Sequence, residues 1–340
     1  MMKAAIYYGK NDIRIEERPI PEVGPDDVLL RNILAGICGT DINIVKAGIG
    51  NMGIRFGSEF GHEIVGEIVQ VGSNVSRDIK VGMRVGINPI TAKKGGKLLS
   101  CECGGFSQYI VIEEAALNYN LYEMADHISN ELAVLIEPMS VGRHGAFSAD
   151  PKPNDHIVVL GAGPIGLSAA AGLIAEGIEN VCVVDIDAWR LEKAAELRAH
   201  TINTAEVSLE EGLVSHFGVI RNSYGAEIPN VNVFIDAAGA PPLFENVMRI
   251  AHEEARISVI AVYKSPVAVD LGLVMMNEIQ IKGASGYTHE DITKVIDHIS
   301  NQKTNIGSII TQVYKLDQIQ EAFEKAIEAK GTIKVVVDLT

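Results

Sequence analysis

The chain has 340 residues, of which 47% are hydrophobic and 21% charged, and it carries a net charge of −15. This length exceeds what one ordinary hydrophobic core supports and predicts two domains. The acidic balance argues against nucleic acid or an anionic membrane as a partner, because both are bound through concentrated Lys and Arg. No apolar run is long enough to span a bilayer. The first residues read as a β-strand rather than a signal peptide, so we expect a cytoplasmic protein whose four cysteines are reduced.

Residues 1 to about 150 read as short strands separated by glycines. β-Branched or alternating runs recur with Gly, Asn, Pro or Ser between them. They include VLLRNILAGI (28–37), HEIVGEIVQVG (62–72), GMRVGI (82–87) and FSQYIVI (106–112). This pattern is typical of a compact all-β barrel or sandwich.

From about residue 154 the pattern changes to strands that alternate with helices. HIVVLG (156–161) reads as a buried strand, PIGLSAAAGLIAEG (164–177) as a helix and NVCVVDID (180–187) as the next strand. Continuous apolar strands joined by helices are typical of a parallel sheet covered on both faces. After about residue 286 the remaining helices and strands either extend this sheet or return to the first domain, and the pattern leaves both open.

A glycine-rich turn follows the first strand of that alternation. Gly161, Gly163 and Gly166 form the G-x-G-x-x-G pattern, and about 20 residues later a strand ends in Asp185. The glycines permit a tight turn, close approach of a pyrophosphate and close helix–strand packing, while the helix N-terminus attracts negative charge. The acidic residue favours NAD over NADP, although Arg190 lies near enough to accommodate a 2′-phosphate.

Three clusters in the first half carry zinc-ligand side chains. Cys38 stands in AGICGTD, His62 and Glu63 follow Gly61, and Glu137 lies in an apolar stretch before a proline. Singly, the thiol and the imidazole are explained as core residues and Glu137 as a partner of Arg143. A catalytic zinc takes three such ligands and an exchangeable oxygen. Together with a dinucleotide loop, the clusters therefore favour a metal site.

The motifs GICGTD, GHEIVGEIVQVGSNV, VGMRVG, GGFSQYIVI, IEPMSVG and VVLGAGPIGL occur in that order. This ordered set resembles the zinc-containing branch of the medium-chain dehydrogenase/reductase superfamily over essentially the whole chain. The most similar members are the sorbitol (polyol), butanediol and threonine dehydrogenases. The resemblance implies an α/β fold with an all-β part. A GroES-like catalytic domain (1–149) would be followed by an NAD-binding Rossmann domain (150–286) and a C-terminal return to the catalytic domain (287–340).

The resemblance also implies roles for individual residues. Cys38 and His62 would be zinc ligands, Glu63 a ligand or near-ligand, and Glu137 a carboxylate in or beside the coordination sphere. Thr40 would take the proton of the substrate hydroxyl. The expected NAD contacts come from the glycine loop and the strand and helix after it: Gly161, Gly163, Pro164, Ile165, Gly166, Asp185 and Arg190.

Two departures from the family pattern matter. Many relatives bind a second, structural zinc through four closely spaced cysteines, whereas the matching segment here holds only Cys101 and Cys103. Two thiols cannot close a four-ligand site, so we expect one catalytic zinc and no structural zinc. Where relatives often have a histidine, five residues after Cys38, this chain has Asn43, so a proton relay beyond Thr40 must use water, the cofactor ribose or another group.

The expected activity is the NAD- and zinc-dependent interconversion of a secondary alcohol, such as a polyol or diol, and its ketone. The alternatives are L-threonine 3-dehydrogenase-like activity on a hydroxy-amino acid, a zinc-free NADPH enone or quinone reductase, and a protein that binds NAD without turnover. Proximity to the clusters suggests Phe56, Glu59 and Arg143 as pocket residues, without identifying the alcohol. The resemblance implies a homodimer or homotetramer.

Overall fold

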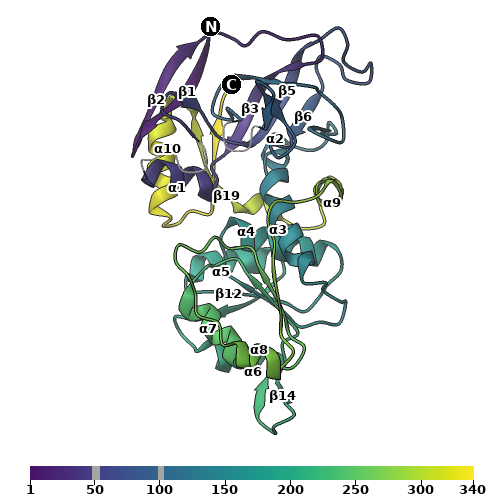
Figure 1. The fold of residues 1–340 in the computed structure, drawn as a ribbon, viewed down its shortest axis with the longest axis vertical. Helices are drawn as coiled ribbons and strands as arrows, with labels where there is room; N and C mark the ends of the chain where they lie inside the picture. Colours follow the sequence, from purple (N-terminus) through teal and green to yellow (C-terminus); the bar gives the residue numbers. More distant parts are fainter. Residues whose placement is uncertain (48–53, 99–102) are drawn as a thin grey trace. The chain divides into compact units, whose positions relative to one another are not determined.

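The computed structural model describes residues 1–47, 54–98 and 103–340. Its contacts divide the chain into two compact units (Figure 1). One joins Met1–Glu137 to Ile310–Thr340, and the other is Pro138–Ile309. The domain limits expected from the sequence, 149/150 and 286/287, stay a prediction. None of the described helices is long and apolar enough to cross a bilayer.

The first unit is built mainly of strands. Three of them form a sheet in the order β2-β1-β4, and seven form a sheet in the order β10-β6-β5-β3-β20-β19, with β9 also on β3. The strands are β1 (Met2–Gly9), β2 (Asp12–Arg18), β3 (Val28–Gly36), β4 (Ser58–Glu59), β5 (Glu63–Val71), β6 (Arg84–Ile87), β9 (Tyr109–Ile112), β10 (Leu121–Glu123), β19 (Ile310–Lys315) and β20 (Lys334–Asp338), with a small hairpin of β7 (Lys93–Lys94) and β8 (Lys97–Leu98).

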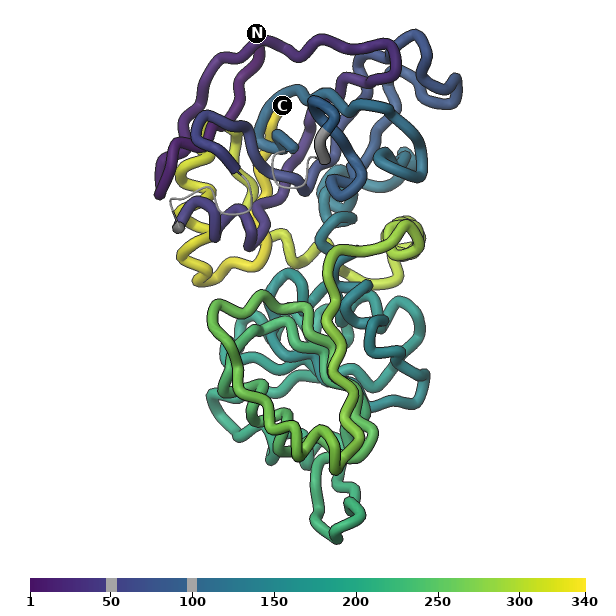
Figure 2. The backbone as a smooth tube through the Cα atoms, in the orientation of Figure 1, coloured from purple at the N-terminus to yellow at the C-terminus, as the bar shows by residue number. Residues whose placement is uncertain are grey.

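The end of the chain belongs to the first unit. Figure 2 shows the C-terminal trace returning beside the N-terminal one. β20 pairs antiparallel with β3, matching Val336 to Gly36, and parallel with β19. The unit also holds the helices α1 (Gly39–Ala47), α2 (Asn130–Ala133) and α10 (Ile319–Glu328), with a 3₁₀ turn at Leu316–Gln318. The C-terminal strands thus complete the seven-stranded sheet that contains β3 and β5.

Packed aromatic rings hold the C-terminal helix α10 against the first unit. Phe323 of α10 packs against Phe60 and Phe106, with ring centroids 5.6 and 5.5 Å apart, and Phe60 and Phe106 lie 5.0 Å from each other. All three side chains are fully buried. Burying a ring of this size contributes about 1.5–3 kcal/mol. The cluster therefore holds the segment that leads into His62 against the C-terminal helix.

The second unit is a six-stranded, wholly parallel sheet in the order β13-β12-β11-β16-β17-β18. The apolar runs that predicted buried strands are buried at β11, β12 and β16. The strands are β11 (Ile157–Leu160), β12 (Val181–Asp185), β13 (His200–Asn203), β16 (Val233–Asp236), β17 (Arg256–Val259) and β18 (Gln280–Gly283).

Helices connect these strands, and side-chain caps begin several of them. Ser208 and Thr288 start α6 and α9 with capping boxes, each satisfying backbone N–H groups of the first turn. The helices are α3 (Ile136–Ser148), α4 (Pro164–Ala175), α5 (Ala188–Glu196), α6 (Leu209–Phe217), α7 (Pro241–Ile250), α8 (Leu271–Met276) and α9 (His289–Ser300), with a 3₁₀ turn at Ile306–Ile309. A hairpin of β14 (Val219–Arg221) and β15 (Glu227–Pro229) follows α6.

A buried ion network ties α3 to α4 and α9. Arg143 donates to Asp291 Oδ1 at 2.5 Å and to Glu176 Oε1 at 2.7 Å, and His144 Nδ1 lies 2.9 Å from Asp291 Oδ2. Burial would raise the pKa of Asp291, but hydrogen bonds from Thr288 and these two side chains lower it. Arg143, suggested by sequence proximity as a pocket residue, is thus committed to two carboxylates inside the second unit.

His298 of α9 makes stability depend on pH. Burial and the nearby cations Lys303 and Arg143 lower its pKa to about 4, against about 6.5 in an unfolded chain. Between these values the unfolded chain binds a proton here and the folded chain does not. The corresponding stability is therefore fully present above pH 6.5 and is lost as the pH falls towards 4.

We expect His298→Asn to show a smaller loss of urea midpoint between pH 7 and pH 5 than the unchanged protein. Fluorescence of Trp189 reports on the second unit, because this residue is the one tryptophan of the chain and lies in α5. His127→Asn, at an exposed position, is the control and should keep the original pH dependence. Equal pH dependence in the His298 variant would contradict the assignment.

Candidate active site

The structure brings Cys38, His62 and Glu63 together. One ligand atom from each lies within 4.8 Å of the other two, and no other trio of His, Cys, Asp or Glu does so within the described ranges. Cys38 follows β3 and precedes α1, while His62 and Glu63 lie at the start of β5. Because β3 and β5 are antiparallel with Gly36 opposite Glu63, the end of one strand meets the beginning of the other. The imidazole and the carboxylate are buried, and the thiol is partly exposed.

Asp41 supports this cluster from the first turn of α1. Its Oδ2 accepts the Cys38 N–H at 2.9 Å, and its Oδ1 lies 3.6 Å from His62 Nδ1. Burial raises the pKa of Asp41 to about 6, against the opposing attraction of His62. Burial alone would lower the pKa of His62, but Asp41 and Cys38 raise it well above its usual value. With Nδ1 facing Asp41, Nε2 of His62 is left to face a metal, the arrangement common among histidine ligands.

Lys334 is a member of this cluster that sequence reasoning missed. It lies in β20, and its Nζ contacts Glu63 Oε2 and donates to the Ile37 carbonyl at 3.0 Å. Both charged side chains are 1% exposed. Burial would lower the pKa of Lys334, but Glu63 and Cys38 outweigh it and raise the pKa. The available signal was a lysine inside the apolar run TIKVVVDL (332–339), since a cation in a buried strand requires a partner.

Gly36 leaves room for that ion pair. A Cβ at this position would lie 2.0 Å from Glu63 Oε2 and 2.9 Å from Lys334 Cε. No side chain therefore fits at the end of β3 while Glu63 and Lys334 keep their contact. A sulfur, an imidazole nitrogen and a carboxylate oxygen that converge in a buried site match the donor set that zinc prefers.

Three further predicted residues lie around this cluster. Glu137, the second residue of α3, is half-buried and is not part of the compact trio. Its charge contributes to the raised pKa values of His62 and Lys334, which places it in their neighbourhood. Thr40 is partly exposed in the first turn of α1, and Asn43 is exposed on the same helix.

The segment expected to lack a structural zinc is described only in part. Cys103 is buried and makes no disulfide, whereas Cys101 lies outside the described residues. The expectation of a single zinc therefore stays a prediction.

The glycine loop has the strand–turn–helix context that its motif requires. Gly161 follows β11 with a φ of +98°, and Gly163 is the N-cap of α4, with Pro164 and Ile165 in the first turn. A Cβ on Gly166 would lie 1.9 Å from the Gly161 carbonyl oxygen, so glycine is required for this close approach. The N-terminus of α4 thereby stays open to an anion.

Asp185 lies at the carboxyl end of β12, next to that loop. Its carboxylate accepts backbone N–H groups from Ala162 at 2.6 Å, Ile186 at 2.7 Å and Asp187 at 3.0 Å. These bonds hold a negative charge at the edge where a dinucleotide ribose binds in such folds. Arg190 of α5 reaches the turn as well, with Nη1 4.0 Å from where a Cβ of Gly163 would lie.

The Glu63–Lys334 pair predicts a specific pattern of stability. In metal-free protein, Lys334→Met leaves a buried carboxylate unpaired and should lower the free energy of unfolding by about 3–5 kcal/mol. The double variant Glu63→Gln, Lys334→Met removes both charges and should recover much of that loss. Urea unfolding followed by far-UV circular dichroism in EDTA measures both. Equal stability of the single and double variants would show that the pair carries no such energy.

Comparison with known proteins agrees with this geometry. Two family models match, the alcohol dehydrogenase GroES-like domain over residues 24–120 and the zinc-binding dehydrogenase over residues 164–301. Sorbitol dehydrogenase of Bacillus subtilis is 31% identical, covering 99% of this chain and 97% of that protein. (R,R)-Butanediol dehydrogenase of Neisseria gonorrhoeae is 30% identical and covers 99% of both. An alcohol dehydrogenase of Escherichia coli complexed with NADH has a TM-score of 0.84 at 27% identity over 99% of each chain.

These matches confirm the fold class and the resemblance drawn from the ordered motifs. They span both units, and the converging Cys38, His62 and Glu63 lie within the first matched domain. The chain therefore belongs to the zinc-dependent alcohol dehydrogenase family of the medium-chain dehydrogenases, whose typical cofactors are zinc and NAD.

Proposed function

We propose that this protein is an oxidoreductase that uses zinc and NAD to interconvert a secondary alcohol and its ketone. The observation that carries this proposal is the buried convergence of Cys38, His62 and Glu63 within 4.8 Å. A zinc-free enone or quinone reductase would have no use for this donor set. A protein that binds NAD without turnover would not need it either.

Different residues of the first unit would bind the zinc, orient its histidine ligand and accept the proton of the alcohol. Cys38, His62 and Glu63 hold the zinc, and Asp41 orients the imidazole by facing its Nδ1. Glu137 is the neighbouring carboxylate in or beside the coordination sphere. Zinc in such a site is a Lewis acid that favours loss of the hydroxyl proton at neutral pH. The Thr40 hydroxyl takes that proton while it passes its own proton on. Because Asn43 does not titrate, the receiving group is water or the cofactor ribose.

The residues of the second unit bind and orient the cofactor, which carries the redox chemistry. The turn through Gly161, Gly163 and Gly166 receives the pyrophosphate at the N-terminus of α4. Asp185 accepts the adenosine ribose hydroxyls and repels a 2′-phosphate, which favours NAD over NADP. Arg190, close to Gly163, is assigned to the phosphates.

The substrate class follows the relatives, which are named for sorbitol and butanediol. A polyol or diol is therefore the proposed substrate. A hydroxy-amino acid, as used by the threonine dehydrogenases of the same branch, is the second candidate. We also propose a homodimer or homotetramer in the cytoplasm, with no nucleic acid or membrane partner.

Metal content and turnover should depend on Cys38. We expect Cys38→Ser to lose the bound zinc and to lower the rate of NAD reduction roughly 100-fold or more, tested with a panel of diols, polyols and hydroxy-amino acids. Cys182→Ala is the matched control, because burial in β12 raises the pKa of this thiol to about 12 and makes it inert. Chelation should abolish activity and added zinc should restore it. Full activity and full metal content in the Cys38 variant would contradict the proposal.

Cofactor choice should depend on Asp185. Replacing it by serine removes the negative charge next to the ribose, so the ratio of kcat/KM for NAD to that for NADP should fall at least about tenfold. Glu192→Gln removes an exposed carboxylate from α5 and should leave the ratio unchanged. A ratio that does not respond to Asp185→Ser would assign the preference to another residue.

A further inference from the structure

Asp236 is a buried carboxylate that the proposed chemistry does not use. It is the last residue of β16 and is 1% exposed. In the sheet it lies between Leu160, the last residue of β11, and Val259, the last residue of β17. Burying a carboxylate is costly unless hydrogen-bond donors satisfy it, so the donors around Asp236 indicate what it holds in place.

The two carboxylate oxygens of Asp236 join two turns of the chain. Oδ1 accepts the N–H groups of Ala238 and Gly239, both at 3.1 Å, in the turn that follows β16. Oδ2 accepts the hydroxyl proton of Tyr263 at 2.6 Å, in the turn that follows β17. Hydrogen bonds from a hydroxyl to a carboxylate are among the strong ones. The side chain of Asp236 therefore fixes each turn relative to the other.

These two turns also pack against the glycine loop. A Cβ on Gly161 would lie 3.2 Å from Ala238 Cα. Gly239 has a φ of +62°, and a Cβ there would lie 3.1 Å from the Cβ of Ala261. The turns after β11, β16 and β17 thus form one packed row at the carboxyl border of the sheet.

The turn after β17 exposes an apolar side chain while its neighbour is held. Val262 is 82% exposed. The ring of Tyr263 packs edge-on against Phe244 of α7, with ring centroids 6.2 Å apart, so the ring has a support that does not involve the hydroxyl. Burial and the hydrogen bond to Asp236 raise the pKa of Tyr263, so the hydroxyl keeps its proton and stays a donor.

The direction of the cofactor follows from the strand order. The chain runs outward from β11 to β13 and then returns to β16 on the other side of β11, and dinucleotides bind across such a reversal. The proposed cofactor site assigns the pyrophosphate to the turn after β11 and the adenosine ribose to Asp185, at the end of β12. The nicotinamide half must then extend the other way, over the ends of β16 and β17.

We propose that Asp236 and Tyr263 are positioning residues, which hold the turns after β16 and β17 in the shape that receives the nicotinamide half of NAD. This role rests on the proposed NAD-dependent function. A turn that is already ordered loses less conformational entropy on binding, so the hydrogen bond favours affinity for the cofactor. It also keeps the reactive ring at a fixed place, to which the rate of hydride transfer is sensitive.

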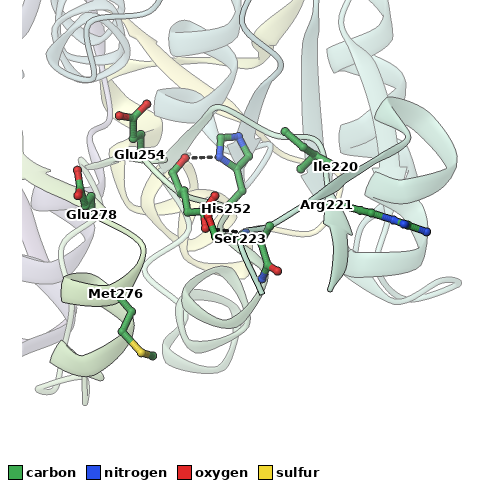
Figure 3. Close-up of a pocket in the computed structure, with 9 residues that line it drawn as sticks. Ile220, Arg221, Ser223, His252, Glu254, Met276 and Glu278 are labelled. Carbon is green, nitrogen blue, oxygen red and sulfur yellow. Dashed lines mark hydrogen bonds between the residues drawn. The ribbon is translucent and has the colours of Figure 1, made fainter. Parts of the chain in front are cut away.

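A cavity of about 480 Å³ lies at the opposite border of the same sheet (Figure 3). Its lining residues include His252, which precedes β17, and Glu278, which precedes β18. Because the strands are parallel, these residues lie at the amino ends of the strands, whereas Tyr263 follows the carboxyl end of β17. The hairpin of β14 and β15 also lines this cavity, and its Tyr224, which is 71% exposed, supplies a control tyrosine outside the cofactor site.

Removing the hydroxyl of Tyr263 tests the proposal. Tyr263→Phe keeps the ring, and binding is measured by isothermal titration calorimetry with NADH and with ADP, which lacks the nicotinamide half. We expect the Kd of NADH to rise about three- to tenfold, because the freed turn is ordered only on binding, while the Kd of ADP stays the same. Tyr224→Phe should change neither Kd. The assay requires neither zinc nor turnover.

A second variant tests whether the two side chains act as one. Asp236→Asn keeps an oxygen for the backbone N–H groups but replaces the charged acceptor of the Tyr263 hydroxyl by a neutral amide, so it should also raise the Kd of NADH. In the double variant with Tyr263→Phe, the combined effect should be smaller than the product of the two single effects, as expected for partners in one hydrogen bond. Urea unfolding confirms that each variant is folded under the conditions of the titration.

The possible results separate this role from the proposed function. Equal weakening of NADH and ADP binding in Tyr263→Phe would assign the pair a general structural role, and an unchanged Kd of NADH would leave it no role at the cofactor. Either result, or single effects that multiply fully in the double variant, would overturn the positioning role and leave the dehydrogenase standing. An unchanged protein that fails to bind NADH would instead overturn the proposed function, and the positioning role with it.

Discussion

The pairing of β3 with β5 is the constraint on which the first unit depends. Gly36, the last residue of β3, lies opposite Glu63, the first residue of β5. Cys38, just after β3, therefore lies close to His62, just before β5. A slip of one residue would turn every side chain of β5 to the opposite face and would separate the sulfur from the imidazole. β20 then pairs with the last residues of β3, beyond the part that pairs with β9, and supplies Lys334 from near the end of the chain. The site is thus a product of strand register.

Opposite charges explain how several ionisable side chains can be buried around Glu63 and Lys334. A carboxylate beside a thiol is costly in a buried site unless a cation offsets it. Lys334 offsets Glu63 directly, and Gly36 keeps open the space in which the two meet. The sulfur of Cys38, the imidazole of His62 and the carboxylate of Glu63 together suit a divalent cation such as zinc. The donors proposed to bind zinc would thus be stabilised in their buried site by the cation itself.

The sequence predicted whatever depends on local pattern, and it missed what depends on distant pairing. The strand–helix alternation, the glycine loop and the Cys38–His62–Glu63 group all follow from short motifs. Lys334 did not, because its partner is 271 residues away and only the sheet order joins them. Helix α3 was also missed, since Pro138 and glycines lower its propensity. Pro138 stands in the first turn, where proline is tolerated. Gly142 lets α3 approach α4 so closely that a Cβ would lie 2.5 Å from Ser168 Cβ.

The second unit presents its proposed cofactor site at one border of its parallel sheet. At the carboxyl ends of its strands, turns leave N–H groups and Asp185 available to a dinucleotide.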